Sequence, residues 1–197
     1  MMPKRARTAE DRDATMMTNL ISSYMIAQKL IESRRELHRP LHLVFTTSIL
    51  VKFHCATPFG LRVFNPQIAN DWEKALMPSD VSGPLKYAIS KIGLATLSSS
   101  ISQRHLPNVT ATAVHPGTVY TNIMSNLPSR QQLYIRLARP FITSIGDAGA
   151  NLARAATQPL PVGKYYQSDC VKKLPDVVFH EKSIQAFDEV FQQFKIK

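Results

Sequence analysis

The chain has 197 residues, of which 44% are hydrophobic and 19% charged, a composition typical of one folded domain. Its 24 Lys and Arg residues exceed its 14 Asp and Glu residues, which gives a formal net charge of +10. Because the basic residues are spread along the chain without an arginine-rich block, a nucleic-acid-binding protein is not expected.

Cysteine use and hydropathy predict a cytoplasmic protein without a transmembrane segment. Two cysteines, Cys55 and Cys170, cannot form a disulfide framework, and no Cys/His spacing resembles a zinc or other metal site. No apolar run has the length of a membrane span, and no signal-type segment follows the basic start. Cys170 is expected to be a small buried residue, and residues 1–15 to be flexible because they lack an apolar period.

Apolar periods and chain breakers predict an alternation of helices and strands. The predicted elements are a helix over 16–36, a buried strand over 41–45, a short helix within 67–76 in an otherwise irregular stretch over 52–83, a helix over 85–103, a strand from Val109 that ends at Pro116 and Gly117, a helix over 147–157, a strand over 163–169 and an amphipathic helix over 183–194. This alternation predicts a single α/β domain over 1–197, with a doubly wound parallel sheet flanked by helices.

The stretch "KYAISKIGLA" places Tyr87 and Lys91 four positions apart, on the same face of the helix over 85–103. An ammonium group near a phenol favours the phenolate and lowers the pKa of the phenol from its reference value of about 10. Tyr87 is therefore a candidate general acid and base, with Lys91 lowering its pKa. The alternative is a tyrosine at the core boundary beside a solvated lysine, because this spacing also arises by chance.

Six segments, taken together, resemble the short-chain dehydrogenases/reductases, in particular the fungal, retinol-dehydrogenase-like branch. They follow one another in that family's order: "MMTNLISSY", "LHLVFTTS", "YAISK", "VHPGTVYTNI", "GDAGANLARAAT" and "GKYYQSDC". The resemblance implies an oxidoreductase that uses NADP or NAD to interconvert a carbonyl and an alcohol on a hydrophobic small molecule. Fungal secondary-metabolite biosynthesis is the setting that this branch implies.

The resemblance also implies roles for individual residues. Asn19 would hold a water that links Lys91 to solvent, although it has the alternative of tying two strands together. Thr47, or Ser48 beside it, would hold the substrate oxygen where the family has a serine; a threonine keeps the hydroxyl but crowds the pocket with its methyl group. The residues implied at the cofactor are Tyr87, Lys91, Pro116, Gly117, Thr118 and Thr121. His115 is interpreted as a strand-end histidine with a satisfied hydrogen bond.

The sequence departs from the family at its front. The glycine-rich phosphate loop is absent, and the first glycine of the chain is Gly60. In dinucleotide-binding folds such a loop holds the pyrophosphate, because glycines let backbone N–H groups approach it closely. The prediction is therefore a partial, N-terminally truncated Rossmann-like fold in which the strand over 41–45 lies at a sheet edge.

Other functions fit the same residues. A cofactor-independent isomerase, dehydratase or cyclase could use the Tyr87 and Lys91 pair for proton transfer, and a non-catalytic partner subunit would need neither residue. A homodimer would form through the helices over 16–36 and 85–103. The segment "RQQLYIRLARPFI" (130–142) is expected to cover a hydrophobic substrate, or to lie on a membrane surface.

Overall fold

The computed structural model describes residues 7–37, 39–49, 72–76, 83–119, 142–174 and 176–194. The helices, in chain order, are α1 (Ala14–Met16), the π-helical turn η1 (Met17–Ile21), α2 (Ser22–Leu37), α3 (Trp72–Leu76), α4 (Gly83–Gln103), α6 (Ile145–Thr157), α7 (Asp176–Phe179), α8 (Glu181–Phe191) and the 3-10 turn η6 (Gln192–Phe194). The strands are β1 (Leu41–Thr46), β2 (Val109–His115), β3 (Lys164–Gln167) and β4 (Cys170–Lys173).

The four strands form one open sheet in the order β1-β2-β3-β4. The first three run parallel, with Leu41 opposite Val109 and Ala113 opposite Tyr165, and β4 returns antiparallel to β3. The fold is therefore α/β with a mixed, mostly parallel open sheet. β4 is absent from the sequence-based expectation, and Cys170, expected to be buried, is exposed because every residue of this edge strand faces solvent.

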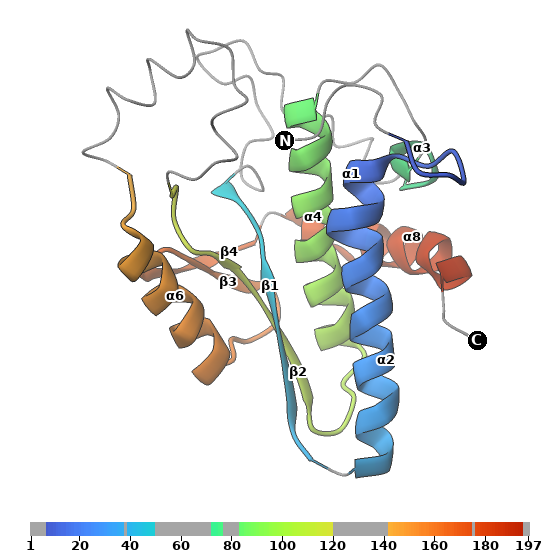
Figure 1. Cartoon of the computed structure of the whole chain (residues 1–197). Helices are drawn as coiled ribbons and strands as arrows, with labels where there is room; N and C mark the ends of the chain where they lie inside the picture. The colour runs from blue at the N-terminus through green and yellow to red at the C-terminus, as the bar shows by residue number, and fades with distance from the viewer. Residues whose placement is uncertain are drawn as a thin grey trace, which may run out of the picture.

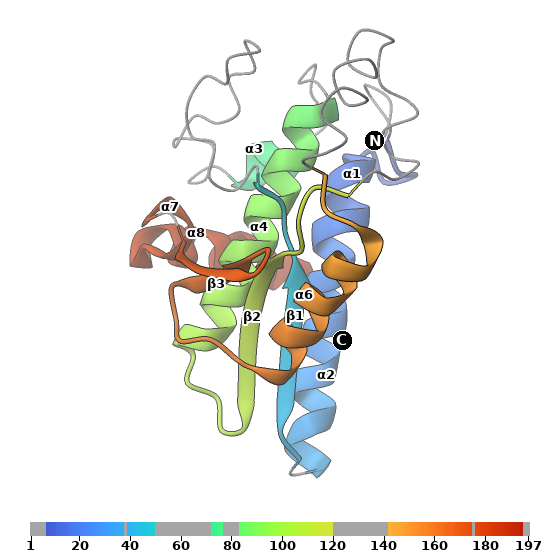
Figure 2. The same cartoon turned by 90° about the vertical axis from the view of Figure 1, so that its left-hand side faces the viewer.

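Helices cover both faces of the sheet, α2 and α4 on one face and α6 on the other (Figure 1, Figure 2). Alternate residues of β1 serve opposite faces, as the two-residue period of a strand requires. Leu43 and Phe45 enter the large core with α2 and α4. Val44 instead packs in a smaller cluster that contains Ala155 of α6 and Tyr166 of β3.

The two crossovers between parallel strands have opposite hands. α4 leads from β1 to β2 across one face, and α6 leads from β2 to β3 across the other, although both steps go to the next strand in the same direction. Since almost all such crossovers are right-handed, one of the two is of the uncommon left-handed kind. As a result α6 packs against β1 and β2, close to the loop that follows β2.

α4 is the central helix of the large core, with all its residues over 92–101 buried. A Cβ at Gly93 would lie 2.2 Å from a methyl carbon of Leu20, so only glycine lets η1 approach α4 this closely. Because other parts of the chain cover α4, this helix has little surface left for the expected dimer face. On α2, by contrast, Ile26 and Leu30 are 60% and 43% exposed.

Aromatic side chains of α2, α3 and α8 pack together in one core. Phe187 and Phe191 of α8 stack with 3.9 Å between ring centroids, and Trp72 of α3 lies edge-on to Phe187 at 5.1 Å. Tyr24 of α2 meets Phe191 at 5.4 Å. All four rings are fully buried, so α2, α3 and α8 are held by the same cluster.

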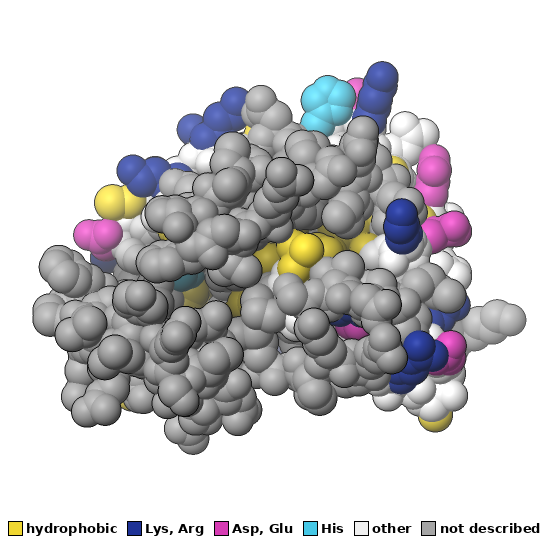
Figure 3. Space-filling model, turned by 90° about the horizontal axis from the view of Figure 1, so that it is seen from above, with side chains coloured by type: hydrophobic (Ala, Val, Ile, Leu, Met, Phe, Trp, Pro, Cys, Tyr) yellow, Lys and Arg dark blue, Asp and Glu magenta, His cyan; other side chains and the backbone are white. Residues whose placement is uncertain are grey.

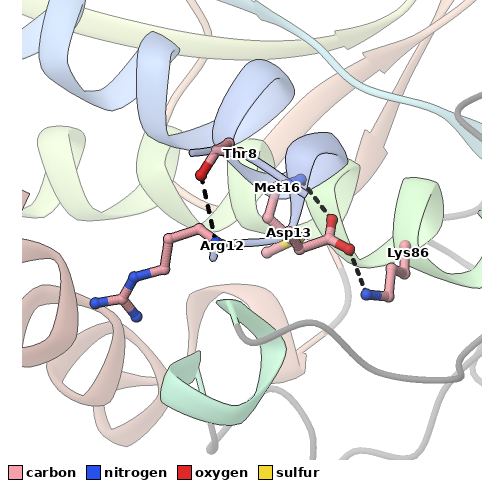
Figure 4. A network of polar contacts seen from close by, with 5 residues as sticks. All are labelled: Thr8, Arg12, Asp13, Met16 and Lys86. Atoms are coloured by element: carbon pink, nitrogen blue, oxygen red, sulfur yellow. Dashed lines mark hydrogen bonds and ion pairs between the residues drawn. The ribbon is translucent and has the colours of Figure 1, made fainter. Parts of the chain in front are cut away.

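A buried ion pair fixes the start of the first helix (Figure 4). One carboxylate oxygen of Asp13 accepts a 3.0 Å hydrogen bond from the backbone N–H of Met16, and the other pairs with the ammonium group of Lys86 in α4. Both charged side chains are buried. Residues 7–15, expected to be flexible, thus form a turn and a helix start attached to α4, while residues 1–6 lie outside the described part of the chain.

β1 lies at one edge of the described sheet. The backbone N–H of Thr47, just after this strand, donates to the carbonyl of Val114 in β2 at 2.7 Å. Since backbone groups of a strand alternate between its two sides, the N–H and C=O groups of His42, Val44 and Thr46 point to the open side.

Two further expectations concern a transmembrane segment and the segment over 130–142. None of the described helices is long and apolar enough to cross a membrane. Residues 120–141, which contain nearly all of the segment expected to cover a substrate, lie outside the described residues.

Candidate active site

The tyrosine and lysine of α4 lie beside the carboxyl end of β1. Lys91 Nζ is 5.6 Å from the centroid of the Tyr87 ring, one helical turn away. It also donates a 2.9 Å hydrogen bond to the main-chain carbonyl of Thr46, the last residue of β1. Both side chains are half-buried. The structure therefore brings the two predicted residues together and ties the lysine to the end of the strand.

Residues 47 and 48 follow directly after β1. Thr47 is 3% exposed, and its buried hydroxyl oxygen has no hydrogen-bond partner among the described residues. A buried hydroxyl without a partner costs about 1–3 kcal/mol, so its occurrence calls for an explanation such as a ligand that completes it. Ser48 is half-buried and already has a polar or electrostatic partner. Of the two hydroxyls, that of Thr47 is the one left open for a substrate oxygen.

Asn19 lies in the π-helical turn η1, a rare helical form that often occurs at functional sites. Its side-chain amide donates a 3.1 Å hydrogen bond to the hydroxyl of Ser90, which in turn donates at 2.7 Å to the main-chain carbonyl of Tyr87. Asn19 thus connects η1 to the helical turn that carries the tyrosine. The alternative, that it ties two strands together, is wrong because its partner lies on a helix.

The loop after β2 is held from two sides. Asn151 of α6 donates a 2.9 Å hydrogen bond to the carbonyl of Pro116, and the N–H of Thr143 donates at 2.9 Å to the carbonyl of Thr118. Gly117 between them has a φ of +118°, and a Cβ there would lie 2.1 Å from the hydroxyl oxygen of Thr143. Only glycine therefore fits at this position, and the main chain of the loop is fixed beside the end of the sheet.

The residues after β1 and the loop after β2 lie at the same end of the sheet, because the carboxyl ends of parallel strands lie side by side. Thr47 and His115 follow or end neighbouring strands, and Figure 3 looks onto this end of the molecule. Hydrophobic side chains appear near the centre of that view, with Lys and Arg side chains toward the rim. His115 is 6% exposed and has a partner, in agreement with its interpretation as a satisfied strand-end histidine.

An open groove of about 430 Å³ lies between α2 and the free side of β1. Its polar lining groups are those of Thr18, Asn19, Ser23, Thr46 and Lys91. The remaining lining is apolar and consists of Ile26, Ala27, Leu30, Leu43, Val44, Phe45 and Leu94. The groove therefore reaches the amine of the candidate site and offers an apolar surface beside it.

Burial changes the acidity of the candidate pair. Desolvation raises the pKa of the Tyr87 phenol above its ordinary value and lowers the pKa of the Lys91 amine, so both shifts favour the uncharged form. The expectation that Lys91 lowers the pKa of Tyr87 is therefore not met, because burial of the phenol is the dominant influence. At neutral pH the phenol keeps its proton, which suits a proton donor.

Three groups among the described residues could hold part of a nicotinamide nucleotide. The open hydroxyl of Thr47, the amine of Lys91 and the fixed main chain at Gly117 are groups that could hold a nicotinamide and its ribose. A pyrophosphate needs a glycine-rich turn at a helix N-terminus. Among the described helices α4 and α6 each have one glycine in the first turn, Gly83 and Gly146, but neither follows a glycine-rich stretch of sequence. In α6 the carboxylate of Asp147 would also repel a phosphate. The pyrophosphate half therefore has no holder among the described residues.

Three residues that shape the site were not predicted from the sequence: Ser90, Thr143 and Asn151. Asn151 carries a readable signal, because it lies on the apolar face of its helix between the buried Ala148 and Ala155. Ser90 and Thr143 become recognisable only from their contacts in space. Thr121, expected at the cofactor, lies outside the described residues.

A comparison with models of known protein families gives no match to this chain, and a search among curated proteins gives none either.

Proposed function

We propose that the chain is an oxidoreductase of the short-chain dehydrogenase type, which interconverts a carbonyl and an alcohol on a hydrophobic small molecule with NADP or NAD. The observation that supports this most is the position of Lys91 at the carboxyl end of β1, beside the Tyr87 ring and bonded to the carbonyl of Thr46. The next residue is Thr47, whose buried hydroxyl has no partner among the described residues. Ligands of open α/β sheets bind at this end. The mostly parallel sheet with helices on both faces is compatible with a partial Rossmann-like fold.

In the proposed reduction the substrate carbonyl lies between two hydroxyl groups. Thr47 donates a hydrogen bond to the carbonyl oxygen, and Tyr87 gives that oxygen its proton. As the phenol loses its proton, the ammonium form of Lys91, placed by the carbonyl of Thr46, stabilises the phenolate that develops. The nicotinamide nucleotide supplies the hydride, because no side chain can.

The raised pKa of Tyr87 decides the protonation state in which the residue enters the proposed reaction. In reduction the phenol acts as an acid and starts protonated, which burial favours. In oxidation it must first become a phenolate, which burial opposes. Near neutral pH, Tyr87 is therefore in the protonated form that carbonyl reduction requires.

Nucleotide binding tests this proposal directly. Isothermal titration of the folded chain with NADPH and with NADH should give saturable heat for at least one of them. In Tyr87→Phe, the reduction of hydrophobic ketones should fall by roughly 10²–10⁴-fold while nucleotide binding persists, since only proton transfer is removed. Tyr166→Phe is the control, because its hydroxyl donates to the carbonyl of Gln158, just after α6, and its loss should leave the rate unchanged. A folded chain that binds neither nucleotide would sink the proposal.

A second candidate is proton transfer without a nucleotide, such as isomerisation of an unsaturated ketone. Two observations favour it: the half-buried pair of Tyr87 and Lys91, and the absence of a pyrophosphate-binding turn among the described residues. The protonated phenol of Tyr87 would donate to the ketone oxygen, and the neutral amine of Lys91, which burial favours, would take the α proton and return it at the γ carbon. Conversion of a β,γ-unsaturated ketone to its conjugated isomer, without added nucleotide and abolished in Tyr87→Phe, is the expected result. Full turnover in that variant would contradict it.

A further inference from the structure

A second cavity lies at the opposite end of the molecule from the candidate active site, at the lower end of Figure 1. There α2 ends and β1 and β2 begin. The cavity has a volume of about 280 Å³ and is lined by Ile31, Arg34, Arg39, Leu106, Pro107, Asn108 and Val109. Two arginine residues thus line a small space whose other lining residues are mainly apolar.

Neither of these arginines has an ion pair or side-chain hydrogen bond within the described part of the chain. The Nε atom of Arg34 is buried and has no partner there, and Arg39 is exposed. Other described arginines do have partners: Arg104 pairs with Asp188 at 2.8 Å, and Arg154 donates to the carbonyl of Asp169 at 2.9 Å. The cavity therefore gathers cationic groups that no described residue neutralises.

This arrangement is unfavourable without a ligand. A buried N–H group that has given up water without gaining an acceptor loses free energy, and two like charges near one cavity repel each other. A planar oxyanion reverses both effects, because a guanidinium group donates two parallel hydrogen bonds to a carboxylate in a fixed fork geometry. Both arginines would gain a partner from the same ligand.

The other lining residues indicate what the rest of the ligand is. Ile31, Leu106 and Val109 line the cavity. Leu106 and Val109 are half-buried residues at the margin of the large core, so this wall offers hydrocarbon to a bound molecule. A hydrated inorganic phosphate would leave the wall uncovered, whereas a short apolar chain or ring would cover it. The volume is at the lower end of the range for small-molecule sites, about 300–1,000 Å³, which restricts the ligand to a few carbon atoms.

We propose that this cavity binds a small organic monocarboxylate, with its carboxylate on Arg34 and Arg39 and its apolar body against Ile31 and Val109. The site lies at the amino ends of β1 and β2, so it is separate from the candidate active site at their carboxyl ends. The inference does not depend on the proposed reaction.

Titration calorimetry of the full chain with hexanoate tests the site. Hexanoate should bind saturably at one site per chain, and hexan-1-ol and inorganic phosphate should each bind at least roughly ten-fold more weakly, because the first lacks the charge and the second the apolar body. No saturable binding of hexanoate would overturn the inference. A smaller difference for either of the other two probes would overturn the assignment to an organic carboxylate.

Variants then identify the residues that hold the carboxylate. Arg34→Gln and Arg39→Gln should each weaken hexanoate binding by roughly ten-fold or more, the usual effect of losing a hydrogen bond between charged groups. Arg39 is exposed, so its replacement leaves the fold intact even if that of Arg34 does not. Arg154→Gln, on α6, removes the same charge elsewhere and should leave the affinity unchanged. Unchanged affinity in Arg39→Gln and in a folded Arg34→Gln would contradict the proposal.

Discussion

Asp13 illustrates how a single residue can attach the start of a helix to another part of the chain. Its carboxylate caps the first helical turn through Met16 and also pairs with Lys86, and both charged side chains are buried. Nothing in the surrounding polar stretch of the sequence distinguishes Asp13 from a solvated acid. The pairing depends on a residue 73 positions later in the chain, which is why sequence patterns predicted flexibility here.

Removing the cation should therefore destabilise the protein strongly. Lys86→Met leaves the carboxylate of Asp13 buried without a counter-charge, and we expect the free energy of unfolding to fall by about 3–5 kcal/mol. Urea unfolding followed by the fluorescence of Trp72, the single tryptophan, measures it.

The control replaces both members of the pair. In the double variant Asp13→Asn with Lys86→Met, the asparagine can still cap the helix while no unpaired charge remains, so most of the lost stability should return. A single variant as stable as the natural chain would show that the ammonium group contributes little.

At the scale of elements, Gly117 in a loop and Gly149 in a helix differ in whether the structure requires a glycine. Gly117 holds the loop after β2 in a backbone conformation that other residues rarely adopt, against Thr143. Gly149 lies within α6, and nothing occupies the space where its Cβ would be.

The two glycines should respond oppositely to alanine. We expect Gly117→Ala to lower the free energy of unfolding by about 1–3 kcal/mol, because both its φ and the contact with Thr143 are incompatible with a Cβ. Gly149→Ala should raise it by roughly 0.5–1 kcal/mol, since alanine favours a helix. Thermal unfolding of both variants measures the difference, and equal effects of the same sign would contradict this reading.

The sequence predicted the long helices and the parallel strands because each has a clear period. β4 was not predicted, since "CVKK" has one apolar branched residue and lies wholly exposed at the edge. In the candidate site, too, only the contact between near neighbours in the sequence was predictable. Tyr87 and Lys91 are local neighbours on one helix, whereas the bond from Lys91 to Thr46 and the link from Asn19 to Ser90 join elements far apart in the chain. Sequence spacing carries no information on such contacts.

For the whole molecule, the stability of the fold at alkaline pH depends on a tyrosine buried in the sheet. Tyr165 of β3 is fully buried at the centre of the large core, and burial raises its pKa to about 12. Between the ordinary phenol pKa of about 10 and that value, the folded chain keeps a proton that the unfolded chain has lost. The stability contributed by the neutral phenol is therefore complete below pH 10 and is lost as the pH rises toward 12.

Tyr165→Phe should remove this part of the pH dependence. From pH 10 to 12 the free energy of unfolding of the natural chain should fall by about 1–3 kcal/mol more than that of the variant, with 1.36 kcal/mol for each unit of pKa shift as the guide. Urea unfolding at several pH values measures both slopes. Parallel slopes over this range would contradict the assignment to Tyr165.

The two edge strands of the described sheet, β1 and β4, are unequally protected against pairing with a strand from another molecule. Along β4 the exposed Lys172 and Lys173 place charge where a foreign strand would have to add, a common safeguard against aggregation. Along β1 the outward N–H and C=O groups border the apolar groove that contains Ile26 and Leu30. Self-association on concentration or heating should therefore begin at β1, and a lysine introduced on that margin is the change best placed to keep the protein monodisperse.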